Sequence, residues 1–127
     1  MTKVTIIIIT HNRPSCLRRL LDYYKDAKND FKIIVSDSSS EENKIMNKEI
    51  ISSFPKLDIL YVGHYLDKID DFRHQAGDSL NYVKTKYCVF CADDDFITPN
   101  GVKQCVDFLE HNPDFTVAHG RYICFYL

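Results

Sequence analysis

The sequence predicts an α/β fold in which helices flank a mostly parallel sheet, and two observations support this prediction. Short runs of apolar and β-branched residues alternate along the chain with longer segments whose apolar residues recur at helical spacing. The first run contains four consecutive isoleucines, Ile6–Ile9, which is typical of a strand buried on both faces. Strands that alternate with helices favour parallel pairing through right-handed crossovers.

Two strands and two helices are predicted in the first half of the chain. The first strand covers residues 3–10, and a helix begins at Pro14, because proline suits the first helical position. The apolar residues of this helix recur at helical spacing: Leu17, Leu20, Leu21 and Tyr24. A second buried strand covers 31–36, and a weaker helix covers 41–54. The predicted inner side of the second helix comprises Ile45, Met46, Ile50 and Phe54.

The second half continues the alternation with a strand over 57–62 and a helix over 66–83. The predicted apolar face of this helix comprises Ile69, Phe72, Ala76, Leu80 and Val83. The fourth strand, 87–92, reads as buried, with Cys88 and Cys91 as core residues. These cysteines cannot hold one metal together, because residues three apart on a strand point to opposite faces.

A last helix and a strand-like end are predicted for the remaining residues. Thr98 caps this helix and Pro99 occupies its first turn. Its apolar stripe comprises Val102, Cys105, Val106 and Leu109. Residues 115–119 and 122–127 then predict one more strand or a hairpin around Gly120.

Composition and charge exclude several classes of protein. The 127 residues, 45% hydrophobic and 27% charged, suit one globular domain over 1–127. A net charge of -2 without a basic block argues against nucleic acid as a partner. The apolar run 4–9 is too short to span a membrane and lacks the flanks of a signal peptide. Five cysteines without a secretory signal favour reduced thiols and a cytoplasmic location.

Three consecutive aspartates, Asp93, Asp94 and Asp95, directly follow the fourth apolar run. Such close carboxylates repel one another, and a divalent cation held by oxygen ligands would balance their charge. Solvated loop residues at a strand end explain the same pattern without a metal. An EF-hand is excluded, because its glycine and glutamate positions would be Thr98 and Gln104. A phospho-acceptor receiver domain is disfavoured, since it gathers carboxylates from separate strands and needs a lysine that has no clear counterpart.

Polar clusters follow the first, second and fourth predicted strands. They are Thr10–Arg13, Asp37–Ser40 and Asp93–Asp95. The carboxyl ends of parallel strands meet at one edge of a sheet, and ligands of such folds bind there. We therefore expect the three clusters to form one site.

Three motifs in this order resemble the family 2 glycosyltransferases of the GT-A fold. They are Thr5-Ile-Ile-Ile-Ile-Thr-His-Asn-Arg-Pro14, Ile33-Ile-Val-Ser-Asp37-Ser and Tyr87-Cys-Val-Phe-Cys-Ala-Asp-Asp-Asp95. The resemblance covers almost the whole chain and matches the N-terminal, nucleotide-sugar-binding half of that domain. It implies a Rossmann-like three-layer αβα sandwich with a mostly parallel sheet, apparently truncated.

The resemblance also implies a function and a set of site residues. A nucleotide-diphosphate sugar, expected to be a UDP-sugar, would bind through Mn²⁺ or Mg²⁺, and its sugar would pass to an unknown acceptor. The implied metal ligands are Asp93 and Asp95. The implied nucleotide-binding residues are Thr10, His11, Arg13, Asp37, Arg73, Asp93 and Asp94. Asp37 would bind the base, with the Thr10–Arg13 loop flanking base and ribose.

Some of these assignments have simpler alternatives. Asp37 also suits a turn or a helix cap. Arg13 would pair with phosphate or with Asp37, or lie solvated, and His11 is also a plain loop residue. Asn12 simply helps to start the helix. Arg73 stands in for an Arg-Asn pair that the family often has where this chain has Ala76-Gly77, and it is otherwise a surface arginine.

In the family, the general base and much of the acceptor site lie beyond the position where this chain stops. We therefore expect the chain to be part of a longer protein and the catalytic base to be absent from it. The alternative is a non-catalytic nucleotide- or metal-binding module. Glycans or glycolipids are the usual acceptors in the family, which allows peripheral association with a membrane.

Overall fold

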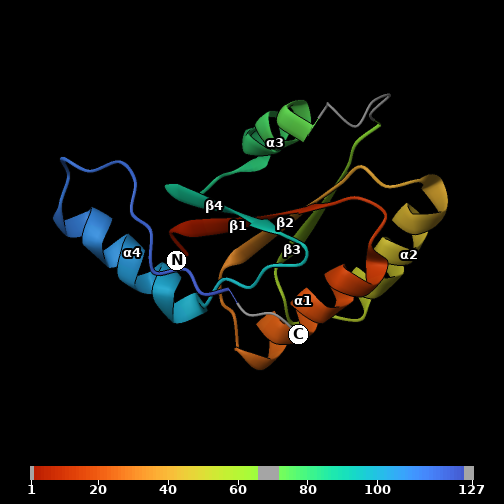
Figure 1. The fold of residues 1–127 in the computed structure, drawn as a ribbon, viewed down its shortest axis with the longest axis horizontal. Helices are drawn as coiled ribbons and strands as arrows, with labels where there is room; N and C mark the ends of the chain where they lie inside the picture. The colour runs from red at the N-terminus through yellow and green to blue at the C-terminus, as the bar shows by residue number, and fades with distance from the viewer. Residues whose placement is uncertain (1, 66–71, 125–127) are drawn as a thin grey trace. The chain divides into compact units, whose positions relative to one another are not determined.

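The computed structural model describes residues 2–65 and 72–124. The chain divides into two compact units, Met1–Phe96 and Ile97–Leu127, which are described separately. In the first unit the elements are β1 (Val4–Thr10), α1 (Pro14–Asp26), β2 (Lys32–Asp37), α2 (Glu41–Ser52), β3 (Ile59–Gly63), α3 (Phe72–Ser79), the short 3-10 helix η2 (Leu80–Tyr82) and β4 (Tyr87–Ala92). The described part of the second unit contains α4 (Pro99–His111) (Figure 1). The single domain over 1–127 stays a prediction.

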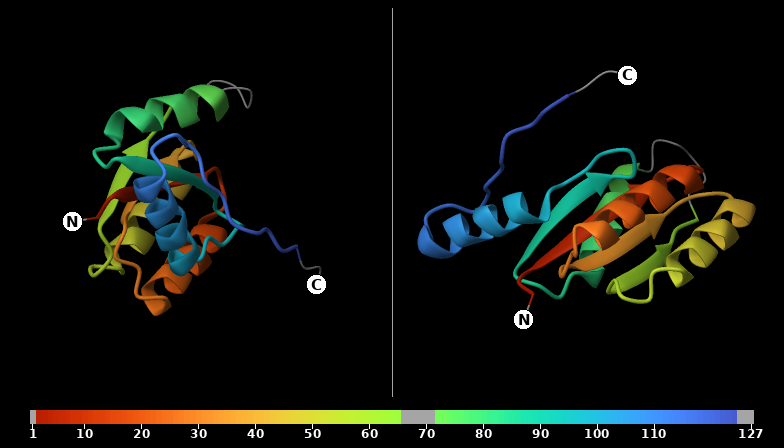
Figure 2. Two further views of the ribbon diagram at one scale, coloured as in Figure 1. Left: turned by 90° about the vertical axis from the view of Figure 1, so that its left-hand side faces the viewer. Right: turned by 90° about the horizontal axis from the view of Figure 1, so that it is seen from below.

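The four described strands form one parallel sheet in the order β3-β2-β1-β4. β1 lies between β2 and β4, so that Ile7 is opposite Ile34 on one side and Phe90 on the other. Helices α1 and α2 cover one face of the sheet and α3 covers the other (Figures 1 and 2). The predicted α/β class with a mostly parallel sheet is confirmed.

The core forms where the sequence is most apolar. Ile6, Ile7 and Ile8 are fully buried, which confirms that β1 is covered on both faces. The predicted apolar residues of α1 are fully buried as well: Leu17, Leu20, Leu21 and Tyr24. Burial of each such side chain contributes about 1.5–3 kcal/mol to folding, so this layer is a main source of stability.

Helix α2 is rotated relative to the prediction. Ile50 is buried as expected, but Ile45 and Met46 are exposed, so the predicted inner side is partly wrong. Asn47 is fully buried instead, and its Nδ2 donates to Asp37 Oδ2 over 2.8 Å. This hydrogen bond to a buried carboxylate determines which side of α2 faces the sheet.

Helix α3 also buries polar residues. Residues 66–71, including Ile69 of the predicted apolar face, lie outside the described residues. Phe72 and Leu80 of that face are exposed, so the prediction is wrong for both, whereas Gln75 and Ser79 are buried. Gln75 Nε2 donates to the Ser36 carbonyl over 3.0 Å, and Ser79 Oγ donates to Ser36 Oγ over 2.8 Å. These bonds to β2 explain why polar side chains face the sheet.

Strand β4 is less buried than predicted, because it lies at an edge of the described sheet. Its residues alternate between more and less covered positions, and Phe90 is exposed. Cys91 is buried, as expected, and this burial raises the pKa of its thiol to about 11. Cys88 is exposed, so its interpretation as a core residue is wrong.

The second unit follows the prediction in its helix but not at its end. Thr98 Oγ1 accepts a hydrogen bond from Gly101 N, and Pro99 occupies the first turn, as expected for the start of α4. The predicted strands 115–119 and 122–127 are absent from the described residues 112–124. A strand needs a hydrogen-bonded neighbour, and the described part of this unit provides none.

A buried histidine gives the fold a testable pH dependence. His64 Nε2 lies 2.9 Å from Ser36 Oγ and its Nδ1 lies 3.4 Å from Asp78 Oδ2. Burial lowers the pKa of His64 below its ordinary value of 6.5, although Asp78 opposes this shift. The unfolded chain therefore takes up a proton at a higher pH than the folded chain does. The resulting stabilisation is complete above about pH 6.5 and is lost as the pH falls below it.

We expect His64→Gln to lower the free energy of unfolding at pH 7.5 by about 1–3 kcal/mol, because it disrupts a buried hydrogen bond. The same variant should weaken the loss of stability between pH 6.5 and 5. Urea unfolding at several pH values measures both effects. His119→Gln, at an exposed position, is the control and should keep the wild-type dependence. An unchanged pH dependence in His64→Gln would contradict this assignment.

Candidate functional site

Three polar clusters meet at the carboxyl edge of the sheet. The strand register places Thr10 opposite Asp37 and Ile9 opposite Ala92, which directly precedes the aspartates. The side chains that follow β1, β2 and β4 are joined by hydrogen bonds and ion pairs, described below. The predicted convergence of the three clusters at one edge is therefore observed.

Asp93 directly follows β4 and is 1% exposed. Thr10 Oγ1 donates to Asp93 Oδ2 over 2.7 Å. Arg13 Nη2 lies 2.6 Å from Asp93 Oδ1, as an ion pair and not as an aligned hydrogen bond, so Oδ1 keeps unused acceptor capacity. Burial raises the pKa of Asp93, while Thr10 and Arg13 oppose this shift.

Asp94 and Asp95 are the accessible members of the triplet. Asp94 Oδ2 accepts from Arg13 Nη1 over 2.9 Å, and its side chain is 49% exposed. Asp95 is exposed, and its backbone N–H donates to the Ala92 carbonyl in the turn after β4. Across the described residues, no three or more acidic, histidine or cysteine side chains converge on one point. The aspartates thus offer carboxylate oxygens to a cation but no complete cage.

Asp37 is fully buried, with its carboxylate directed into the protein. Its Oδ1 accepts from Ser39 N over 2.8 Å. Its Oδ2 accepts from Asn47 Nδ2 over 2.8 Å and from the Tyr61 hydroxyl over 3.0 Å. Burial and the charge of Asp37 raise the pKa of Tyr61. In this arrangement the carboxylate holds the 38–40 loop in place. Pairing with Asp37, one of the alternatives for Arg13, is not formed, because Arg13 pairs with Asp93 and Asp94.

Asn12 connects the loops after β1 and β2, a role that the sequence did not reveal. It adopts a left-handed backbone conformation with φ 53°, which asparagine tolerates better than most residues. Its N–H donates to Ser39 Oγ over 2.8 Å, and its Oδ1 accepts from Ser40 N over 2.8 Å and from Asn43 Nδ2 over 3.0 Å. The available sequence signal was an asparagine in the loop after β1 together with the serines of the loop after β2, since both residue types favour such turns.

The remaining predicted residues differ in their placement. His11 joins the same edge, with Nδ1 2.9 Å from the Ser38 carbonyl. Arg73 is exposed on α3, which covers the face of the sheet opposite to α1. Among the described residues, no ion pair joins Arg73 to Asp37 or to Asp93–Asp95. The structure therefore brings His11 to the site but not Arg73. Asn47 and Tyr61, which hold Asp37, were missed because their partner lies far away in the sequence.

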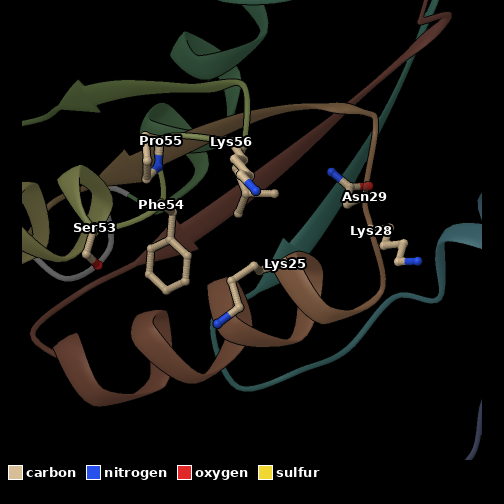
Figure 3. Close-up of a pocket in the computed structure, with 8 residues that line it drawn as sticks. Lys25, Lys28, Asn29, Ser53, Phe54, Pro55 and Lys56 are labelled. Atoms are coloured by element: carbon tan, nitrogen blue, oxygen red, sulfur yellow. The ribbon is translucent and has the colours of Figure 1, made fainter.

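A separate hollow of about 540 Å³ lies at the amino edge of the sheet (Figure 3). Phe54 lies in it among Lys25, Lys28 and Lys56. The charge of Lys25 is balanced locally, because its Nζ lies 3.4 Å from Asp22 Oδ1 and close to the carboxyl end of α1. The carboxyl edge, with its buried and paired carboxylates, remains the stronger candidate.

Comparison with known proteins identifies the family of the chain. Residues 5–126 match the model of Glycosyl transferase family 2. The chain is 31% identical over 116 residues to the rhamnosyltransferase WbbL of Escherichia coli (strain K12), across 91% of this chain and 36% of that protein. It therefore spans about a third of the length of this curated relative.

Two solved structures share the fold. One is the mannosyltransferase PcManGT from Pyrobaculum calidifontis, solved in complex with GDP-Man and Mn²⁺, with a TM-score of 0.70 at 18% identity. The similarity covers 84% of this chain and 32% of that one. The other is S. aureus TarS, with a TM-score of 0.65 at 20% identity, covering 87% and 20%. At these identities the likeness shows the fold, which is that of GT-A glycosyltransferases.

The family match begins in β1 and continues past α4, so it includes all three polar clusters of the carboxyl edge. The resemblance of the three sequence motifs is thereby confirmed. The chain belongs to the family 2 glycosyltransferases.

Proposed function

We propose that this chain forms the donor-binding part of a glycosyltransferase that takes a sugar from a nucleoside diphosphate and transfers it to a glycan or glycolipid. The observation that carries the proposal is the ion-paired cluster of Thr10, Arg13, Asp93 and Asp94 at the carboxyl edge, in a chain of this family. Ligands of open parallel sheets bind at this edge.

A divalent metal fits the chemistry of the aspartates. Asp93 Oδ1 has unused acceptor capacity, and the carboxylates of Asp94 and Asp95 are accessible. Mg²⁺ and Mn²⁺ favour oxygen ligands, and Mg²⁺ is commonly held by one or two carboxylates together with substrate phosphates. We assign Asp95 and Asp93 as metal ligands, with Asp94 facing ribose. The PcManGT complex, which contains GDP-Man and Mn²⁺, supports this pairing of donor and metal.

When bound, the metal supplies positive charge against the negative charge that develops on the leaving diphosphate. The chain's own residues bind and orient the donor. Thr10 holds the carboxylate of Asp93 in one orientation, because it donates a short hydrogen bond from β1. No residue of this chain is assigned as the general base. The alternative is a non-catalytic module, which would bind the donor but form no transfer product.

We assign recognition of the base to the loops after β1 and β2, which Asp37 and Asn12 hold together. The Asp37 carboxylate is closed off from solvent, so a base reaches it only by exchanging with a present partner such as the Tyr61 hydroxyl. A UDP-sugar is the expected donor. GDP-mannose and a rhamnose donor are the alternatives that the two relatives support.

We expect a nucleotide-sugar with Mn²⁺ to raise the melting temperature of the chain, and Asp95→Asn to remove most of this shift. Ligand at 100 times its Kd adds about 2.7 kcal/mol of stability, which is several degrees for a domain of this size. Thermal unfolding with UDP-glucose or GDP-mannose, each with and without Mn²⁺, measures the effect. Asp114→Asn, at an exposed position in the second unit, is the matched control. No shift with any donor would overturn the proposal.

We expect Asn47→Ala to lower the free energy of unfolding by about 1–3 kcal/mol, because it removes one donor to the buried Asp37 carboxylate. It should also weaken nucleotide binding, since the 38–40 loop loses part of its support. Chemical unfolding and calorimetric titration with the donor from the thermal panel measure these effects. Glu49→Ala, on the exposed side of α2, should change neither. Loss of stability with unchanged nucleotide affinity would refute a role for this support in donor binding.

A further inference from the structure

The Arg13 side chain holds two of the three aspartates at once. Its Nη2 lies 2.6 Å from Asp93 Oδ1 and its Nη1 lies 2.9 Å from Asp94 Oδ2. We propose that Arg13 is a built-in counter-ion which the incoming metal displaces from the aspartates when it binds Asp93, and that the released guanidinium then binds the donor diphosphate. This inference rests on the proposed function and concerns how metal and nucleotide are coupled.

Asp93 needs a neighbouring positive charge in the absence of ligand. Its side chain is fully buried, and Thr10 donates one hydrogen bond to it. An unpaired buried carboxylate would cost several kcal/mol. Arg13 supplies the missing charge, so the site remains folded with its carboxylates in place before any ligand binds.

Arg13 is able to move away from the aspartates. Its side chain is 48% exposed and reaches the aspartates from the solvent side. Arg13 is the residue before the first turn of α1, and its side chain makes no capping hydrogen bond to that helix. Movement of the guanidinium therefore breaks the two ion pairs without disrupting α1. The exposed ion pair with Asp94 contributes little to stability. The charge of the buried Asp93 stays balanced, because the metal replaces the guanidinium beside it.

Arg13 and an incoming metal compete for the same carboxylate oxygen atoms. Arg13 Nη2 lies against Asp93 Oδ1, an oxygen assigned to the metal, and a cation placed beside the triplet would also be repelled by the guanidinium. A metal alone must displace Arg13 into water. A metal that arrives with a diphosphate offers Arg13 a new partner, because guanidinium groups bind phosphate oxygens in a bidentate manner. Arg13 thus makes the site favour the metal–diphosphate complex over the free metal.

The two possible roles of Arg13 predict opposite effects on metal affinity. If Arg13 is displaced, its removal frees carboxylate oxygens and strengthens the binding of free Mn²⁺. If Arg13 only maintains the shape of the site, its removal disorders the aspartates and weakens that binding. A purely structural role therefore cannot reproduce a gain in affinity.

The test is calorimetric titration of the wild-type chain, Arg13→Gln and Arg13→Lys with Mn²⁺ alone, and then with UDP and GDP in the presence of Mn²⁺. We expect Arg13→Gln to bind Mn²⁺ alone about tenfold more tightly than wild type, and the enhancement of nucleotide binding by Mn²⁺ to fall about tenfold, within the usual range of coupling between sites. Arg18→Gln removes the same charge from the exposed surface of α1 and should behave as wild type.

Arg13→Lys covers the case in which Arg13→Gln does not fold. A lysine still balances the buried Asp93 but lacks the fork that spans to Asp94, so we expect a gain of a few-fold in Mn²⁺ affinity. Unchanged or weaker binding of Mn²⁺ alone in the folded Arg13 variants overturns the counter-ion role. Failure of the wild-type chain to bind UDP or GDP with Mn²⁺ overturns the proposed function instead, whatever the variants do with free Mn²⁺.

Discussion

The carboxylate of Asp93 lies at the end of β4 with almost no access to water, and its negative charge must be balanced within the protein. Thr10 and Arg13 provide that balance from the end of β1. This interaction joins the two strands where the polar clusters meet. It also determines where the exposed carboxylates of Asp94 and Asp95 lie, because both follow Asp93 in the same turn.

A second buried carboxylate at this edge, Asp37, is balanced in a different way. Neutral donors surround it, from the backbone of Ser39 and the side chains of Asn47 and Tyr61. Neutral donors distributed over a loop, a helix and a strand hold Asp37 firmly in place. A single, half-exposed arginine holds Asp93 and Asp94 and is easily exchanged. The β2 side of the site is therefore the fixed support, and the β4 side is where charge is rearranged when a ligand binds.

Much of the fold follows from apolar spacing, because β1 and α1 bury the residues that the pattern selects. The common edge was predictable too, since parallel strands bring their carboxyl ends together. The polar interior was not predictable. Asn47 and Ser79 face the sheet because of partners 10 and 43 residues away, which apolar periodicity cannot reveal. Arg13 likewise pairs with Asp93 and Asp94, which lie 80 and 81 positions further along the chain.

The part of the chain that the structure describes contains no helix long and apolar enough to cross a membrane.

We infer above all that a divalent metal and a nucleoside diphosphate bind together at the carboxyl edge of the sheet. Paramagnetic broadening of backbone amide signals by Mn²⁺, recorded by NMR with UDP or GDP present, tests it most directly. We predict selective broadening at residues 10–13 and 93–95, with weaker effects at 37–40. Broadening centred on the Lys25–Lys28 end of the sheet, or none above that of free Mn²⁺ in solution, would contradict the account.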